Sequence, residues 1–123
     1  MKILIRNGRV IDPASGRDAA GDLAIADGRV CEALIGKPDR VIDATGMVVA
    51  PGLIDIAARL REPGYEYKAT LESEMDAAVA GGVTSLACPP DTDPPLDEPG
   101  LVDMLRRRAK GLSRARVYPV GAL

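Results

Sequence analysis

The part of the chain after Gly52 alternates short apolar runs with two longer amphipathic segments, and this alternation constrains the fold more than any other feature. Apolar runs of strand length, separated by segments with apolar side chains at helical spacing, are typical of a parallel sheet covered by helices. Thr70 and Pro99 stand where the two helices would begin, since threonine caps helices and proline suits their first position. The expected strands are residues 53–61, 83–88 and 116–123, and the expected helices are residues 70–80 and 99–111. The pattern predicts an α/β fold of the form βαβαβ over residues 52–123.

Residues 1–51 have a different pattern, which predicts a separate β-rich domain. Asn7-Gly8 and Asp27-Gly28, dipeptides that favour tight hairpin turns, each lie between short apolar runs. A third pair of strands is expected on either side of Thr45-Gly46. Strand edges left unpaired in so small a domain favour self-association.

The first strand after Gly52 carries the side chains of greatest chemical interest. In an extended run over residues 53–61, side chains point alternately to the two faces of the sheet. One face then holds Asp55, Ala57, Arg59 and Arg61, and the other is apolar. The apolar face consists of Ile54, Ile56, Ala58 and Leu60. This arrangement predicts a strand backed by helices, with its polar face toward a cavity.

Here the sequence resembles the cyclic amidohydrolases, most closely the dihydroorotases, whose first barrel strand ends in Asp-x-His-x-His followed by Leu-Arg-Glu-Pro-Gly. The second motif is complete at residues 60–64, and the run Cys-Pro-Pro-Asp-Thr-Asp-Pro at residues 88–94 follows the same family. The resemblance implies that residues 1–51 are an N-terminal β-sandwich-like domain and that residues 52–123 begin a TIM (β/α)₈ barrel. A closed barrel takes at least about 200 residues. The resemblance therefore implies an N-terminal fragment of a longer chain, with the family's modified lysine, further histidines and catalytic aspartate beyond Leu123.

The chain departs from the family at its metal ligands. The two histidines of the motif fall on Ala57 and Arg59, while Asp55 is retained, and the chain contains no histidine. A methyl group has no lone pair, and a guanidinium is a cation without an acceptor, so neither binds zinc. We therefore expect no metal cofactor in this segment, although the family uses zinc. Whether Arg59 pairs with Asp55 or with acids outside this chain is left open by the spacing.

A second departure concerns the residues that bind the substrate's carboxylate in the family. The resemblance assigns that role to Arg61 and to an asparagine, which is replaced here by Asp91. A carboxylate at this position repels an anionic substrate. The subsite is then vestigial, and a purely structural alternative is that Arg61 pairs with Asp91 or Glu62.

Three hypotheses about function follow from the resemblance. The first is a non-catalytic dihydroorotase-like protein of pyrimidine biosynthesis that serves as an assembly partner of aspartate carbamoyltransferase catalytic chains, with the exposed loop at residues 89–98 as a candidate docking segment. The second is an active amidohydrolase that hydrolyses cyclic amides with a non-standard metal site. The third is a binding module that senses a pyrimidine intermediate through Arg61.

The composition of the chain argues against a membrane protein, a nucleic-acid-binding protein and a cysteine metal site. No apolar run approaches the ~20 residues that span a membrane, and no signal peptide is visible, so we expect a cytoplasmic protein without a membrane partner. Basic residues are balanced by acids and the only aromatic residues are three tyrosines, so a nucleic-acid partner is not expected. The basic run at residues 106–110 is interpreted as a solvated helix end. Cys31 and Cys88 lack metal-ligand spacing and are expected to be reduced.

Overall fold

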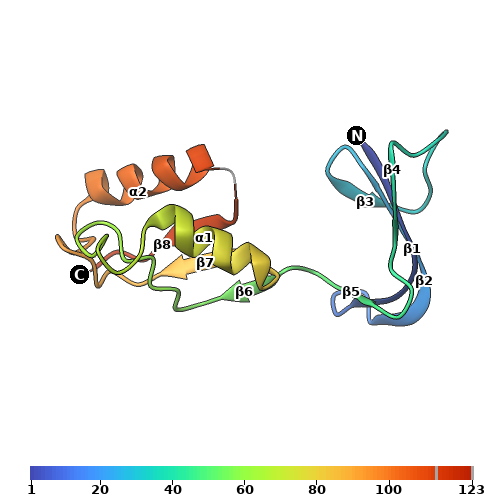
Figure 1. The fold of residues 1–123 in the computed structure, drawn as a ribbon, viewed down its shortest axis with the longest axis horizontal. Helices are drawn as coiled ribbons and strands as arrows, with labels where there is room; N and C mark the ends of the chain where they lie inside the picture. The colour runs from blue at the N-terminus through green and yellow to red at the C-terminus, as the bar shows by residue number, and fades with distance from the viewer. Residues whose placement is uncertain (113, 123) are drawn as a thin grey trace. The chain divides into compact units, whose positions relative to one another are not determined.

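A computed structural model describes residues 1–112 and 114–122. The chain divides into two compact units, Met1–Pro51 and Gly52–Leu123. Each unit has a sheet of its own, and both helices belong to the second unit (Figure 1).

The first unit is a single sheet of five strands. Its strands are β1 (Lys2–Asp12), β2 (Arg17–Ala26), β3 (Arg29–Cys31), β4 (Arg40–Asp43) and β5 (Val48–Val49). They are ordered β3-β2-β1-β4, with β5 also paired to β1. The pairs β1–β2 and β2–β3 are antiparallel, whereas β4 and β5 run parallel to β1. Residues 1–51 thus supply one layer of strands.

The structure confirms one of the three predicted strand pairs. Asp27 and Gly28 both have positive φ, 52° and 77°, as a tight turn requires, and they join β2 to β3. The prediction of a hairpin at Asn7-Gly8 is wrong. Strand β1 continues through these residues, with a register shift between Ile5 and Gly8. Asn7 has φ 62°, and its N–H donates to Asp22 Oδ1 at 3.0 Å. The dipeptide therefore forms a bulge in the strand, which the same backbone preference permits.

The pairing expected around Thr45-Gly46 is also wrong. The strands on either side, β4 and β5, both pair with β1 and not with each other. The segment between them is organised by Asp43, whose carboxylate accepts hydrogen bonds from the Thr45 hydroxyl at 2.7 Å and from the Asn7 amide at 3.1 Å. These bonds, that of Thr45 foremost, lower the pKa of Asp43 below its ordinary value.

The second unit confirms the expected α/β alternation. Its elements are β6 (Leu53–Asp55), α1 (Leu71–Ala80), β7 (Val83–Cys88), α2 (Pro99–Leu112) and β8 (Arg116–Pro119). The strands form a parallel sheet of three in the order β6-β7-β8. Figure 1 shows both helices on the same face of this sheet. The last strand ends earlier than expected, and Leu123, the end of the predicted strand, lies outside the described residues.

The first strand of this unit is much shorter than the predicted extended run at residues 53–61, because the ladder ends at Asp55. There the Asp55 Oδ1 atom accepts the N–H of Ala57 at 2.9 Å, a local bond that competes with strand pairing. The prediction that the apolar face of this run packs under helices is also wrong for Ile54 and Ile56. The side chains of Ile54 and Ile56 are 69% and 82% exposed, whereas Leu60 is buried.

Helix α1 begins as predicted, with Thr70 as its N-cap and a side chain that accepts a hydrogen bond from the N–H of Ser73. Leu71 and Met75 are buried as expected, but Val79, predicted on the same face, is 45% exposed. Among the described residues, no helix is long and apolar enough to span a membrane.

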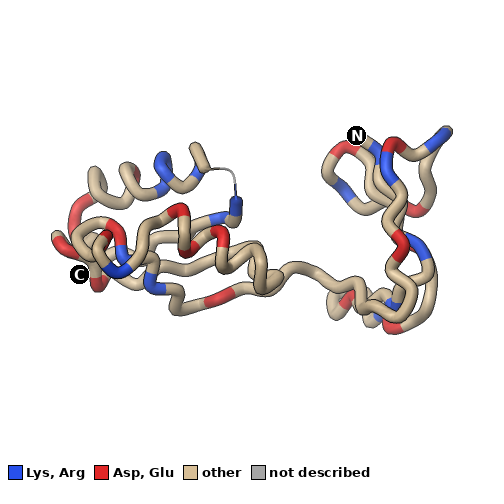
Figure 2. Tube along the Cα trace, viewed as in Figure 1, with Lys and Arg blue, Asp and Glu red and all other residues tan. Residues whose placement is uncertain are grey.

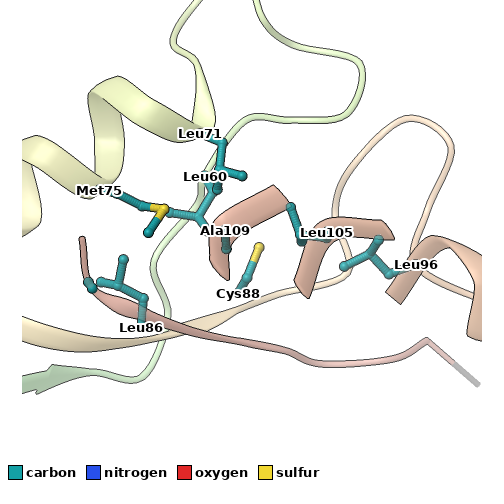
Figure 3. Packing of buried hydrophobic residues seen from close by; sticks show 9 residues of the cluster. Leu60, Leu71, Met75, Leu86, Cys88, Leu96, Leu105 and Ala109 are labelled. Carbon is teal, nitrogen blue, oxygen red and sulfur yellow. The ribbon is translucent and has the colours of Figure 1, made fainter. Parts of the chain in front are cut away.

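The core of the second unit gathers side chains from both helices, β7 and the connecting loops. Figure 3 shows these side chains directed toward one another. The cluster consists of Leu60, Leu71, Met75, Leu86, Cys88, Leu96, Leu105, Ala109 and Ala115. Burying a leucine or methionine side chain stabilises a protein by about 1.5–3 kcal/mol. This cluster therefore holds the loops after β6 and β7 against the helices, and those loops carry the candidate site.

Candidate functional site

The four residues predicted to share one strand face do lie together, although the strand that was to hold them ends early. Asp55, Ala57, Arg59 and Arg61 all line one hollow with a volume of about 530 Å³. Lys68 and part of α1 complete its wall. The backbone after β6 stays beside β7, since the N–H of Ala58 donates to the carbonyl of Ala87 at 3.0 Å.

The most distinctive interaction of the site joins Arg59 to Asp91. The Nε atom of Arg59 donates to Asp91 Oδ2 at 2.5 Å, and the two side chains are 57% and 46% exposed. Asp91 lies in the loop after β7, which is next to the loop after β6 because the two parallel strands end at the same edge of the sheet. Within the described residues, Arg59 therefore pairs with Asp91 and not with Asp55.

Glu62 has a different partner from the one that the sequence favoured. Its side chain is 4% exposed, and its carboxylate forms an ion pair with Arg108 of α2 and accepts the N–H of Leu71 at 2.8 Å at the start of α1. The alternative in which Arg61 pairs with Asp91 or Glu62 is thus wrong. Asp91 forms its ion pair with Arg59, and Glu62 forms its ion pair with Arg108. Arg108 is also not simply part of a solvated helix end. Sequence reasoning missed this link because nothing in the run of basic residues distinguishes Arg108 from its neighbours.

Arg61 is held in an uncommon backbone conformation. Its φ is 63°, a left-handed value that costs a residue with a side chain about 1–3 kcal/mol. The turn is fixed by the Tyr65 N–H, which donates to the Arg61 carbonyl at 2.9 Å, and by the Asp93 N–H, which donates to the Pro63 carbonyl at 3.1 Å. In the part of the chain that the structure describes, the guanidinium of Arg61 has no hydrogen bond or ion pair.

A third cation, Lys68, stands beside two tyrosines at this site. Its Nζ lies 5.2 Å from the ring centre of Tyr65 and 5.5 Å from that of Tyr67, within the range of a cation–π interaction. The hollow thus combines Arg59, Arg61 and Lys68 with two carboxylates on Asp55 and Glu74.

The residues at the family's ligand positions do not fit a zinc ion. Ala57 presents a methyl group, and the guanidinium of Arg59 is bound to Asp91, so neither offers a lone pair to a metal. Over residues 1–112 and 114–122, no three His, Cys, Asp or Glu side chains are grouped closely enough to hold a metal ion.

The two cysteines are free thiols. Cys88 is buried beneath the loop that carries Asp91, and its Sγ lies 3.5 Å from the Pro89 carbonyl oxygen. Burial raises the pKa of the Cys88 thiol, and the negative charge of Asp91 raises it further. Cys88 is therefore a protonated core residue.

Comparisons with known proteins agree on one family. A sequence model described as "Dihydro-orotase-like" matches residues 46–123. A "Dihydroorotase-like protein" from Pseudomonas aeruginosa is 48% identical over 128 aligned residues, which cover 100% of this chain and 30% of that protein. A "Dihydroorotase" from Solibacter usitatus is 46% identical over 126 aligned residues, which cover 100% of this chain and 29% of that protein.

The solved structures extend the agreement to the fold. L-hydantoinase (dihydropyrimidinase) from Arthrobacter aurescens matches 97% of this chain with a TM-score of 0.83 and 22% sequence identity. The match covers 27% of that chain. The present chain thus spans about 30% of the length of the curated relatives that it matches.

Proposed function

The chain belongs to the dihydroorotase-like family, and we propose that it is a non-catalytic member of it. In metal-assisted hydrolysis, the bound metal lowers the pKa of a water molecule, so that a nucleophile is available at neutral pH. The family places two histidines for that purpose at positions occupied here by Ala57 and Arg59.

The ion pair between Arg59 and Asp91 is the observation that carries this proposal. A cationic side chain stands at a ligand position and is bound to a carboxylate at 2.5 Å, so it repels a divalent ion. The same pair joins the loop after β6 to the loop after β7.

The βαβαβ unit is consistent with the first part of a TIM (β/α)₈ barrel, and the single sheet of residues 1–51 with one layer of a sandwich-like domain. Parallel order β6-β7-β8 with the helices on one face is the arrangement that such a barrel repeats. In that barrel the loops after β6 and β7 would lie at the carboxyl ends of the strands, where sites are found.

For the whole protein we propose a cytoplasmic role in pyrimidine biosynthesis, as an assembly partner of aspartate carbamoyltransferase catalytic chains. The proposal rests on the family and on the loss of the ligand residues. The loop at residues 89–98 is a candidate docking segment, because it is Pro-rich and its side chains at Asp93, Asp97 and Glu98 are exposed.

The test is transferase activity and complex mass, measured for the cognate transferase alone and after addition of the full-length protein. We expect added protein to raise activity and to produce a defined larger complex. A variant with Asp97→Lys and Glu98→Lys should weaken that complex, whereas the same charge change at Asp27 and Glu32 in the first unit serves as the matched control. No change in activity or mass on adding the protein would contradict the proposed partnership.

A further inference from the structure

Two consecutive residues in the loop after β6, Arg61 and Glu62, line two different hollows. Arg61 lines the hollow of about 530 Å³ that also contains Arg59. Glu62 lines a hollow of about 570 Å³ between the start of α1 and the end of α2. The two hollows have no lining residue in common. The peptide that joins Arg61 to Glu62 therefore connects the candidate site with the two helices.

The backbone conformation at Arg61 needs support from outside its own residue. Its φ of 63° is a left-handed value, which a residue with a side chain keeps only where the surrounding structure determines it. The hydrogen bond from the Tyr65 N–H to the Arg61 carbonyl lies within the same turn. Bonds to other elements come from the next two residues, Glu62 and Pro63, of which Pro63 accepts the Asp93 N–H.

The Glu62 carboxylate is held by both helices. It accepts the Leu71 N–H at 2.8 Å, and the first N–H groups of a helix have no partner within the helix itself. It also forms an ion pair with Arg108 of α2. The Glu62 side chain is 4% exposed, so the protein and not water supplies its partners. One buried carboxylate thus ties the turn at Arg61 to α1 and to α2.

The partner that is open to the surface is Arg108, whose side chain is 54% exposed. Helix α2 has basic residues at positions 106–108 and 110, whereas the charged residues of α1 are all acidic. Figure 2 shows this difference between the two helices. Removal of the Arg108 charge leaves the Glu62 carboxylate buried without a counter-charge, and the cost of that state drives the carboxylate toward water.

We propose that the Glu62–Arg108 pair is the positioning link of the candidate site. While the pair is formed, Glu62 is held between the helices and the turn keeps Arg61 in its left-handed conformation, with its side chain at the hollow that contains Arg59. When the pair is broken, Glu62 leaves its buried position and Arg61 relaxes. A partly exposed side chain of α2 is thereby coupled to the candidate site. The link concerns the conformation of the loop, so it holds whether or not the site is catalytic.

The test is amide hydrogen exchange of the full-length protein, followed by mass spectrometry of the peptide that contains residues 61–65. We expect this segment to exchange about tenfold faster or more in Arg108→Ala than in the wild type, because the turn opens locally. Modification of the Arg61 guanidinium by phenylglyoxal should also be faster in this variant. Arg108→Lys keeps a cation at the same position and should restore most of the protection.

The matched control is Leu105→Ala, which removes a fully buried side chain from α2 without changing the pair. It lowers global stability, yet it should leave exchange at residues 61–65 within about twofold of the wild type. Equal acceleration in the control would show that the pair contributes only to global stability, and this would overturn the proposal. Unchanged exchange in Arg108→Ala would overturn it as well. If circular dichroism shows that Arg108→Ala does not fold, Glu62→Gln repeats the test, since its amide oxygen can still accept the Leu71 N–H.

Discussion

The buried pair of Glu62 and Arg108 gives the most specific prediction about stability. In Glu62→Gln the side chain keeps its size and an oxygen that can accept the Leu71 N–H, but the ion pair with Arg108 is lost. Hydrogen bonds to charged groups contribute about 1.5–3 kcal/mol, and breaking a buried pair costs about 3–5 kcal/mol. Because the Arg108 side chain is 54% exposed and regains water, we expect a loss near the lower range, about 2 kcal/mol.

Removal of the other partner, Arg108, should lower the free energy of unfolding by more. Arg108→Ala leaves the carboxylate of Glu62, whose side chain is 4% exposed, without its counter-charge, so we expect a loss of about 3 kcal/mol. The double variant should lose less than the two single losses together, because the partners share one interaction.

Chemical denaturation followed by circular dichroism measures these free energies of unfolding. The matched control is Arg107→Ala, one position away on α2 and without an ion-pair partner among the described residues, which should change stability by no more than about 0.5 kcal/mol. Equal small losses for Arg108→Ala and Arg107→Ala would refute the interpretation that Glu62 is a buried, charge-dependent link between the two helices.

Three further predictions concern backbone, thiol and pH. Gly64→Ala should destabilise the protein by at least about 2 kcal/mol in thermal or chemical unfolding. The φ of Gly64 is 99°, and the new methyl group would meet the backbone of Asp93 in the neighbouring loop. Gly100→Ala, which has open space around the new methyl group, should not have this effect. A thiol reagent at neutral pH should modify Cys31 well before Cys88, whose burial raises its pKa; equal rates would contradict the packing. Asp43→Asn should lower stability at pH 7, because the lowered pKa of that carboxyl means that its charged form stabilises the fold. This difference between wild type and variant should shrink as the pH falls below about 4 and through the lowered pKa, and a difference that grows toward acid pH would contradict it.

Local signals in the sequence predicted the parts of the fold that depend on a few adjacent residues. Thr70 caps α1 and Asp27-Gly28 turns between β2 and β3, because each acts through its own backbone and its nearest neighbours. Asn7-Gly8 carries the same turn signal, yet it forms a bulge. The choice between turn and bulge depends on Asp22 and on strand pairing, which a dipeptide does not encode.

The sequence predicts which residues after β6 lie close together, but it does not predict which charged side chains form pairs. The motif places Asp55, Ala57, Arg59 and Arg61 close together, and in the structure all four line one hollow. Which carboxylate meets which arginine depends on segments about 30 positions or more apart in the chain, such as the loop that brings Asp91 to Arg59. Spacing within one strand contains no information about such contacts.

The proposed absence of a catalytic zinc site at the positions of Ala57 and Arg59 can be measured in the full-length protein. The most direct measurement is the zinc content of the full-length protein after dialysis, combined with an assay of dihydroorotate hydrolysis on the same sample. We expect far less than one zinc ion per chain and no hydrolysis above that of buffer. One tightly bound zinc ion per chain together with enzymatic turnover would contradict the proposal that the protein is non-catalytic.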